Sequence, residues 1–281
     1  MSRQMTFDLG GKVALVTGGG TGLGYHMARS LMRCGAAVVI SARRQTVLDD
    51  AIDQLSAENL PGCVTASTVD LSDRSSLAAL VEKVSASFGG VDIFAGNAGQ
   101  DLMEHVDRIT DRAFDQMMQV NLSANVELVR AFVPHMRQKR WGRILFSSSA
   151  AALCASPHEG SSIYSASKNA INTFARTIAT ELGHDGITVN SLSLGMFLTD
   201  IVRDAFTRLD REQGAGAGDA ARDSFASMTA LGRLGELPEI EGLIQLLASD
   251  AGGYITGSTL AVDGGLSIML RPNPVTQDVG Q

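Results

Sequence analysis

Short runs of aliphatic residues alternate along the chain with longer segments in which apolar residues recur every three or four positions. The runs have the length of buried strands, and the longer segments have the periodicity of amphipathic helices. Seven runs are predicted as strands, at residues 12–16, 36–41, 64–69, 91–95, 142–147, 186–193 and 258–262. Because parallel neighbours need crossovers of this length, the pattern predicts a seven-stranded parallel sheet with helices on both faces.

The alternation predicts a single domain over residues 1–270. It is interrupted at residues 213–219, Gln-Gly-Ala-Gly-Ala-Gly-Asp, inside a helical stretch at 201–228. Since another strand and helix follow, we interpret this interruption as a flexible excursion within the domain. Residues 271–281 have no apolar periodicity, and they are predicted to be a tail that is disordered or ordered only by a partner.

Composition narrows the class of protein. With 281 residues, 44% of them apolar, the chain can bury a sizeable core. A net charge of −7 and 5% aromatic residues argue against nucleic acid or an anionic membrane as a partner. The sequence shows neither a membrane-length apolar run nor a signal peptide, so we expect a cytoplasmic protein. Cys34, Cys63 and Cys154 lack metal-binding spacing, so we expect free thiols and no metal site.

A glycine-rich turn, Thr-Gly-Gly-Gly-Thr-Gly-Leu-Gly at 17–24, joins the first predicted strand to the first helix. Glycines permit positive φ and let a pyrophosphate approach the helix N-terminus. The turn lacks the Lys-Ser or Lys-Thr of a phosphate-loop NTPase, and its spacing differs from G-x-G-x-x-G. Its position favours dinucleotide binding over a plain tight turn. The residues predicted to contact the dinucleotide here are Gly18, Thr21, Gly22, Leu23 and Gly24.

The end of the second predicted strand indicates which dinucleotide binds. An acidic residue there would accept a hydrogen bond from the ribose 2′-OH of NAD, but this chain reads Ser41-Ala42-Arg43-Arg44. Guanidinium groups suit a 2′-phosphate, so NADP(H) is the preferred cofactor and NAD(H) the alternative. The other interpretation is that Arg43 and Arg44 simply begin a solvated helix.

Tyr164 and Lys168 are four residues apart, which places them on one face of a helix. An ammonium about 4 Å from the phenolate would lower the tyrosine pKa by about three units from about 10. Tyr164 is therefore predicted to be an acid–base group near neutrality. By itself the spacing is weak, because a surface helix can carry an incidental tyrosine and lysine.

Further motifs surround this pair in a fixed order. They are Asp70-Leu71, Asn97-Ala98-Gly99, Asn121 in Val-Asn-Leu, Ser149 at the end of Ser-Ser-Ser, Ile187-Thr-Val-Asn190, Gly232-Arg-Leu-Gly235 and Asp263-Gly-Gly265. With them, the chain resembles the short-chain dehydrogenase/reductase family, single-domain oxidoreductase branch, over nearly its whole length. It has general similarity to gluconate 5-dehydrogenases and 3-oxoacyl-acyl-carrier-protein reductases.

The resemblance implies a Rossmann-type, doubly wound α/β three-layer sandwich with strand order 3-2-1-4-5-6-7. It also implies hydride transfer between a nicotinamide C4 and a carbonyl or carbinol carbon, with Tyr164 exchanging the proton of the substrate oxygen. Lys168 would lower the tyrosine pKa and hold the nicotinamide ribose. Ser149 would hydrogen-bond the carbonyl oxygen, and Asn121 would hold a water that links Lys168 to solvent.

The remaining cofactor contacts are also carried by the resemblance. Asp70 with Leu71 would meet the adenine, and Asn97, Ala98 and Gly99 would line the cofactor. The family's Pro-Gly after the sixth strand is Leu194-Gly195 here, and Thr199 is our candidate for holding the carboxamide. Two assignments have structural alternatives, since Asn121 could cap a helix kink and Asp70 could cap the following helix.

Two segments near the site depart from the family pattern. The stretch before Tyr164 is about two residues longer than usual, and counting forward from Gly142 selects Ser149 among the three serines. The extra residues surround His158 and Glu159, which would contact a polar substrate or belong to a solvated loop. Residues 196–230 form a long lid segment with Phe197, Phe206 and Phe225, either a mobile lid over substrate or a surface helical hairpin.

The leading hypothesis is an NADP-dependent oxidoreductase acting on a small-molecule ketone or secondary alcohol. The alternative is an NAD-dependent dehydrogenase of a sugar acid or polyol. A non-catalytic NADP-sensing regulator is the hypothesis from a different class, and retention of both Tyr164 and Lys168 argues against it. The resemblance further implies a homotetramer or homodimer formed through the helices that carry Asn121 and Tyr164 and through the C-terminal strand region.

Overall fold

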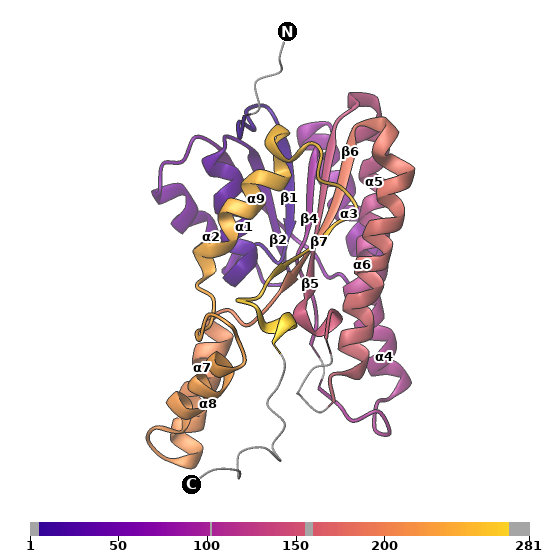
Figure 1. The fold of residues 1–281 in the computed structure, drawn as a ribbon. Coiled ribbons are helices and arrows are strands. Elements are labelled where there is room, and N and C mark those ends of the chain that lie inside the picture. Colours follow the sequence, from indigo (N-terminus) through magenta and orange to yellow (C-terminus); the bar gives the residue numbers. More distant parts are fainter. Residues whose placement is uncertain (1–5, 102, 155–159, 270–281) are drawn as a thin grey trace.

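A seven-stranded parallel sheet forms the middle layer of the molecule (Figure 1). The computed structural model describes residues 6–101, 103–154 and 160–269. The strands are β1 (Val13–Thr17), β2 (Ala37–Ala42), β3 (Cys63–Thr68), β4 (Ile93–Gly96), β5 (Gly142–Ser149), β6 (Ile187–Leu194) and β7 (Thr259–Val262). Their spatial order is β3-β2-β1-β4-β5-β6-β7, which confirms the order implied by the family resemblance.

Helices cover both faces of this sheet, as expected for a doubly wound fold (Figure 1). One face carries α1 (Gly22–Arg33), α2 (Gln45–Ala57) and α9 (Glu241–Ala248). The other carries α3 (Arg74–Phe88), α5 (Ala124–Lys139) and α6 (Ser162–Leu182). The further α-helices are α4 (Asp111–Met118), α7 (Asp200–Gln213) and α8 (Ala217–Ser227). Short turns η3 (Gly183–Asp185), η4 (Leu237–Ile240), η5 (Asp250–Gly252) and η6 (Leu266–Ile268) complete the connections.

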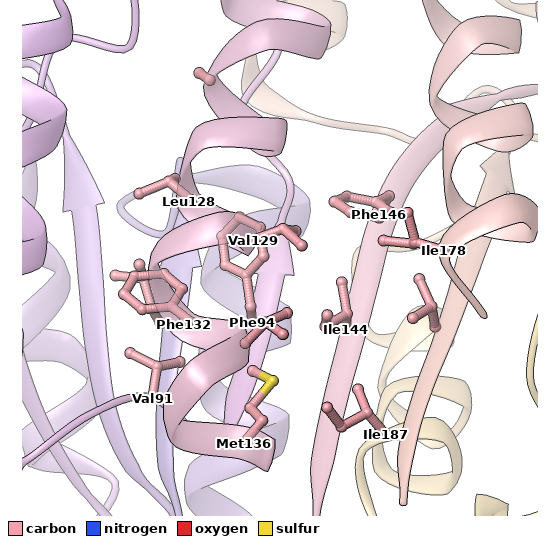
Figure 2. Packing of buried hydrophobic residues seen from close by; sticks show 14 of the residues in the cluster. Val91, Phe94, Leu128, Val129, Phe132, Met136, Ile144, Phe146, Ile178 and Ile187 are labelled. Atoms are coloured by element: carbon pink, nitrogen blue, oxygen red, sulfur yellow. The ribbon is translucent and has the colours of Figure 1, made fainter. Parts of the chain in front are cut away.

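Alternate residues of each central strand enter two separate cores. In β4, Phe94 belongs to the cluster under α3, α5 and α6, whereas Ile93 and Ala95 belong to the cluster under α1, α2 and α9. In the first cluster the ring of Phe94 lies 5.8 Å from that of Phe132 and 6.1 Å from that of Phe146 (Figure 2). Such tilted and edge-on pairs add roughly 1 kcal/mol each beyond the area they bury. Both faces therefore hold the sheet rigidly.

Local sequence signals set the helix ends. Asp73 accepts a hydrogen bond from the backbone N–H of Ser75 and so caps α3, and Gly89 ends that helix with φ +78°. Strand order reverses between β1 and β4, which lie side by side although two other strands separate them in the chain. The carboxyl ends of these strands are the usual place for a ligand crevice in such a sheet.

The α7–α8 hairpin differs from the sequence prediction. A flexible excursion at residues 213–219 is wrong, because α8 already begins at Ala217 and the turn between the helices is short. Asp210 Oδ1 accepts hydrogen bonds from the N–H groups of Gly216 at 3.1 Å and Gly218 at 2.8 Å, which fixes the turn. A Cβ at Gly218 would collide with the Phe206 carbonyl. That glycine permits close helix packing rather than flexibility.

The expectations about the C-terminal tail and the domain boundary concern residues at or beyond the end of the described part of the chain. The tail predicted at 271–281 lies outside the described residues, so neither the tail nor the single-domain boundary at 270 is tested. Within the described ranges, no helix is both long and apolar enough to cross a membrane.

Candidate functional site

The glycine-rich turn leaves the amino end of α1 open. Gly18 and Gly22 adopt left-handed φ values of +66° and +53°, and a Cβ at Gly24 would collide with the Gly18 carbonyl. Among the described residues, Thr21 at the N-cap makes no side-chain capping bond. Leu23 in the first turn faces the large cavity described below. The N–H groups and the positive end of the helix dipole therefore remain available for an anion.

Asn97 ties this turn to two neighbouring strands. Its Nδ2 donates to the Thr17 carbonyl at 3.1 Å, and its Oδ1 accepts from the Ser147 hydroxyl at 3.0 Å. The Thr17 hydroxyl oxygen in turn accepts from the N–H groups of Asn97 and Ala98. Asn97 also lines the cavity. The side chain thus fixes the relative positions of the ends of β1, β4 and β5.

Tyr164 and Lys168 lie one turn apart on α6, as the spacing predicts. Lys168 is buried, and its Nζ donates to the Ser147 carbonyl at 2.9 Å. The same Nζ lies 5.8 Å from the centroid of the Tyr164 ring. Gly99 leaves room for this ammonium, since a Cβ there would lie 3.0 Å from the Lys168 Nζ. Burial lowers the pKa of Lys168 to about 8, an effect that the carboxylate of Asp101 opposes.

The predicted lowering of the Tyr164 pKa is wrong for this arrangement. Burial of the phenol raises the pKa of Tyr164, a hydrogen bond with Ser149 lowers it, and the charge of Asp101 raises it further. The Lys168 ammonium donates to a carbonyl and lies beneath the ring at 5.8 Å, so it does not offset the cost of desolvation.

The three consecutive serines at the end of β5 have different partners. The Ser147 hydroxyl donates to Asn97 Oδ1, and the Ser148 hydroxyl donates to the Lys168 carbonyl at 3.1 Å. Ser149 instead hydrogen-bonds Tyr164, and its oxygen caps the short turn η2 (Ala150–Ala152) by accepting from the N–H of Ala151 at 3.2 Å. Of the three hydroxyls, that of Ser149 is the one paired with the phenol.

Asn121 lies in a π-helical turn, η1 (Gln119–Ser123), between α4 and α5. Its Oδ1 accepts from the N–H of Gln100 at 2.7 Å, and its Nδ2 donates to the Gln100 carbonyl at 3.0 Å and the Ser167 hydroxyl at 2.9 Å. The freed Asn121 carbonyl accepts from Asn125 Nδ2 at 3.0 Å. Asn121 therefore belongs to a helix distortion and also clamps the loop after β4, while its predicted role in holding a water stays a prediction.

The residues predicted to read the adenosine half lie at the ends of β2 and β3. Arg43 and Arg44 are exposed, and Arg44 is the N-cap of α2. Asp70 Oδ1 accepts from the N–H and hydroxyl of Ser72, and these bonds lower the Asp70 pKa, helped by the charge of Arg43. The alternative that Asp70 caps the next helix is wrong, because the N-cap of α3 is Asp73. Leu71 is buried in the core.

Gly195 and Thr199 lie on the opposite side of the crevice, after β6. A Cβ at Gly195 would collide with Asp263, so the backbone here packs directly on the segment after β7. Thr199 is the N-cap of α7, and its Oγ1 accepts from the N–H of Val202 at 3.3 Å. Its methyl group lies 3.6 Å from where a Cβ of Gly22 would be, which places Thr199 over the glycine-rich turn.

A cavity of about 800 Å³ is lined by seven of the predicted site residues, Leu23, Asn97, Gly99, Ser149, Tyr164, Lys168 and Gly195. The other predicted residues, Gly18, Thr21, Gly22, Gly24, Arg43, Arg44, Asp70, Leu71, Ala98, Asn121 and Thr199, do not line it. The lining also contains mainly apolar side chains, those of Met103, Cys154, Met196, Val202, Phe225, Met228 and Leu266. His158 and Glu159, which would contact a polar substrate or belong to a solvated loop, lie outside the described residues. In the parts of the chain that the structure describes, no group of three or more His, Cys, Asp or Glu could hold a metal ion.

Sequence reasoning missed two polar groups at this site. Asp101 lines the cavity directly after Asn97-Ala98-Gly99-Gln100, and an acidic residue so close to that motif was the available signal. Asn125 takes the space beside Gly96, where a Cβ would collide with its Oδ1. The family pattern has a pair of asparagines where this chain has Gly96-Asn97, and the glycine in place of the first asparagine was the available signal for this second group.

The chain is similar to known proteins in sequence and in fold. A family model described as short chain dehydrogenase matches residues 12–210. A tropinone reductase homolog from Arabidopsis thaliana is 34% identical over 263 residues, which cover 93% of this chain and 92% of the relative. The 3-oxoacyl-[acyl-carrier-protein] reductase of Escherichia coli is 34% identical over 262 residues, covering 93% and 99%. The crystal structure of L-sorbose reductase from Gluconobacter frateurii, complexed with NADPH and L-sorbose, is 31% identical, with a TM-score of 0.89 and coverage of 95% and 100%.

Proposed function

The chain belongs to the short-chain dehydrogenase family of oxidoreductases, and on this premise we propose that it transfers hydride between NADP(H) and a ketone or secondary alcohol. The observation that carries the proposal is the pairing of Ser149 with Tyr164 above the buried Lys168, in one cavity with the open end of α1. The nicotinamide, when bound, supplies or accepts the hydride. The chain's own groups bind, orient and exchange the proton.

The residues present fit a dinucleotide. Left-handed Gly18 and Gly22 and the uncapped start of α1 form a cradle for the pyrophosphate. Arg43 and Arg44 at the end of β2 would hold a 2′-phosphate, and the segment from Ser41 to Arg44 offers no carboxylate to a free ribose 2′-OH. The related L-sorbose reductase was crystallised with NADPH. These observations favour NADP(H) over NAD(H).

In the reducing direction Tyr164 is the proton donor. Its raised pKa keeps the Oη proton in place at neutral pH, and the Ser149 hydroxyl beside it would bind the same substrate oxygen. As the proton leaves, the Lys168 ammonium beneath the ring stabilises the tyrosinate that forms. Asn121 holds both backbone groups of Gln100, which keeps the loop after β4 against this site.

The α7–α8 hairpin is the lid in this proposal. Val202, Phe225 and Met228 line the cavity with apolar side chains, so closing the hairpin would exclude water from the reacting atoms.

Assembly as a homotetramer or homodimer is also part of the proposal. Phe114 on α4 and Tyr254 after α9 are exposed aromatic side chains that a second copy could cover. Light scattering on the purified protein would measure the assembly.

The test combines cofactor binding with turnover. Fluorescence titration should show tighter binding of NADPH than of NADH, and absorbance at 340 nm should show NADPH oxidation by at least one ketone of a panel of ketoses, oxo esters and 3-oxoacyl thioesters. Tyr164→Phe should keep NADPH binding and lose turnover by about 10²–10⁴-fold. Full activity of Tyr164→Phe would overturn the proton-transfer assignment. Preferred binding of NADH would instead overturn the reading of Arg43 and Arg44.

A further inference from the structure

The loop after β4 carries one acidic side chain beside the candidate active site. Asn121 clamps both backbone groups of Gln100, and the N–H of Glu104 donates to the Gly160 carbonyl at 3.1 Å. Gly160 accommodates this contact because a Cβ there would lie 2.6 Å from the Glu104 nitrogen. Asp101 lies between these two attachments. The loop is therefore attached to η1 just before Asp101 and to Gly160, ahead of α6, at Glu104.

Asp101 faces the same cavity as Tyr164 and Lys168. Its charge raises the pKa of both groups, against or in addition to the larger effect of burial. Its side chain is exposed and lines the cavity. A substrate oxygen bound to Tyr164 would bring its neighbouring substituents within range of this charge.

The charges of the cavity are unevenly placed. Among the described residues that line it, the charged ones are Asp101 and Lys168. Lys168 is buried beneath Tyr164 with its ammonium on the Ser147 carbonyl, so it is already engaged within the protein. Within the described lining, a substrate substituent would therefore meet the Asp101 carboxylate and apolar side chains, whereas sites built for anionic substrates present arginine or lysine.

We propose that Asp101 is a specificity-determining residue that selects neutral ketones and secondary alcohols and disfavours substrates with a carboxylate next to the reacting carbon. The inference rests on the proposed function and names the substrate class of the same site. A carboxylate substituent would meet the charge of Asp101 and would lose its hydration against the side chains of Met196, Phe225 and Met228. A neutral ester or hydroxyalkyl group would meet neither penalty. The proposal separates neutral polyols and oxo esters from 2-oxo and 2-hydroxy acids.

A matched pair of substrates tests this selectivity. A 2-oxo acid and its methyl ester differ by one charge at nearly equal size. For the wild type we expect kcat/KM to favour the ester by at least about tenfold. Asp101→Asn keeps the shape and removes the charge, and it should narrow this ratio by about threefold to tenfold, mainly by lowering KM for the acid. Both compounds are also measured as inhibitors of reduction of the best ketone, so selectivity is read even where one of them is not turned over.

Asp107→Asn is the matched control. It removes one negative charge from the same connection, at an exposed position that does not line the cavity. The ester-to-acid ratio of Asp107→Asn should equal that of the wild type. A general effect of net charge on anion approach would move the ratio equally in both variants, and that outcome would overturn the assignment to Asp101.

The pH profile supplies a readout that a merely structural role would not change. The groups acting on the Tyr164 phenol are Asp101, the Ser149 hydroxyl and the Lys168 ammonium beneath the ring. Because the charge of Asp101 raises the Tyr164 pKa, Asp101→Asn should move the midpoint of the profile for alcohol oxidation to lower pH. Asp107→Asn should leave that midpoint in place. A loose loop would instead lower kcat for acid and ester together.

The outcomes distinguish this inference from the proposed function. Absence of NADPH oxidation with every ketone would overturn the proposed function. Turnover with equal efficiency for acid and ester, or an unchanged ratio in Asp101→Asn, would overturn the inference and leave the function intact. If Asp101→Asn does not fold, the salt dependence of the ester-to-acid ratio of the wild type tests the proposal instead. Raising salt from about 20 mM to about 500 mM should screen Asp101 and narrow the ester-to-acid ratio, and a salt-independent ratio would contradict the proposal.

Discussion

The two sides of the cavity are built in opposite ways. On the sheet side, Asn97, Asn121 and Lys168 each join segments that are far apart in the sequence, through hydrogen bonds in buried or half-buried places. On the other side, α7 and α8 extend away from the sheet (Figure 1), and every residue of α7 is at least partly exposed. The rings of Phe206 and Phe225 lie 6.2 Å apart, so the two helices pack on each other.

This difference separates two tasks of the site. Proton transfer needs atoms held within a fraction of an ångström, which the sheet side provides through strands and clamped loops. Admission of substrate needs a surface that can open, and segments with few buried contacts open at the lowest cost. We therefore expect substitutions on the sheet side to change kcat and global stability. Substitutions in the hairpin should change substrate affinity instead.

The largest expected effect belongs to the sheet side. Lys168→Met keeps most of the side-chain volume but removes the ammonium beneath Tyr164, so kcat for ketone reduction should fall by about 10²–10⁴-fold. Lys83→Met, at an exposed lysine of α3, is the control and should keep wild-type kcat. Steady-state kinetics at 340 nm measure both. A Lys168→Met enzyme within tenfold of the wild type would break the proposed division of tasks.

The Asn121 clamp is expected to have the next largest effect, on stability. Asn121→Ala removes three hydrogen bonds and leaves both backbone groups of Gln100 without their partners, so the free energy of unfolding should drop by about 2–4 kcal/mol. Asn169→Ala removes one exposed hydrogen bond on α6 and should cost less than about 1 kcal/mol. Urea denaturation gives both values. Equal losses of unfolding free energy in Asn121→Ala and Asn169→Ala would show that the Asn121 clamp stabilises the fold no more than an exposed hydrogen bond does.

The fold was largely predictable from the sequence, and its strand order was not predictable from periodicity. Apolar runs placed every strand to within about two residues, because each strand contains a short apolar run that lies in the sheet. Periodicity does not encode which strands are neighbours, so the order came from motif resemblance. The glycines after Gln213 misled because glycine serves both flexible chain and close contact, and at Gly218 it allows close contact with Phe206.

The candidate site was predictable where its residues share one element and was not where they come from several. Tyr164 and Lys168 follow from spacing on one helix, and counting along β5 selected the serine that pairs with the phenol. The direction of the Tyr164 pKa did not follow, because desolvation depends on how several segments enclose the ring. Asp101 and Asn125 were missed for the same reason, since their relevant neighbours lie on α6 and β4.

The buried ammonium also makes the sheet side sensitive to pH. The pKa of Lys168 is lowered from 10.5 to about 8, so the unfolded chain binds more protons between these values and the folded protein gains stability as pH rises. The destabilisation that comes from burying the charged Lys168 side chain is fully present below about pH 8. The stability of Lys168→Met relative to the wild type should therefore fall by about 1–2 kcal/mol between pH 7 and pH 9.5. Denaturant titrations at both pH values measure it, and a constant difference would mean that Lys168 is not desolvated.

The smallest expected effect tests the hairpin side of the comparison. Phe225 lines the cavity and Phe206 packs behind it, so Phe225→Ala should raise KM for a ketone by about threefold to tenfold with little change in kcat. Phe206→Ala should change KM less, because it removes the support of the ring rather than the contacting surface. The free energy of unfolding of both variants should lie within about 1 kcal/mol of the wild-type value, since α7 and α8 contribute little to the two cores. If Phe225→Ala instead lowered kcat as far as Lys168→Met, the hairpin would have to hold the reacting atoms in place. The cavity would then not be divided into a sheet side that positions these atoms and a hairpin side that closes over the substrate.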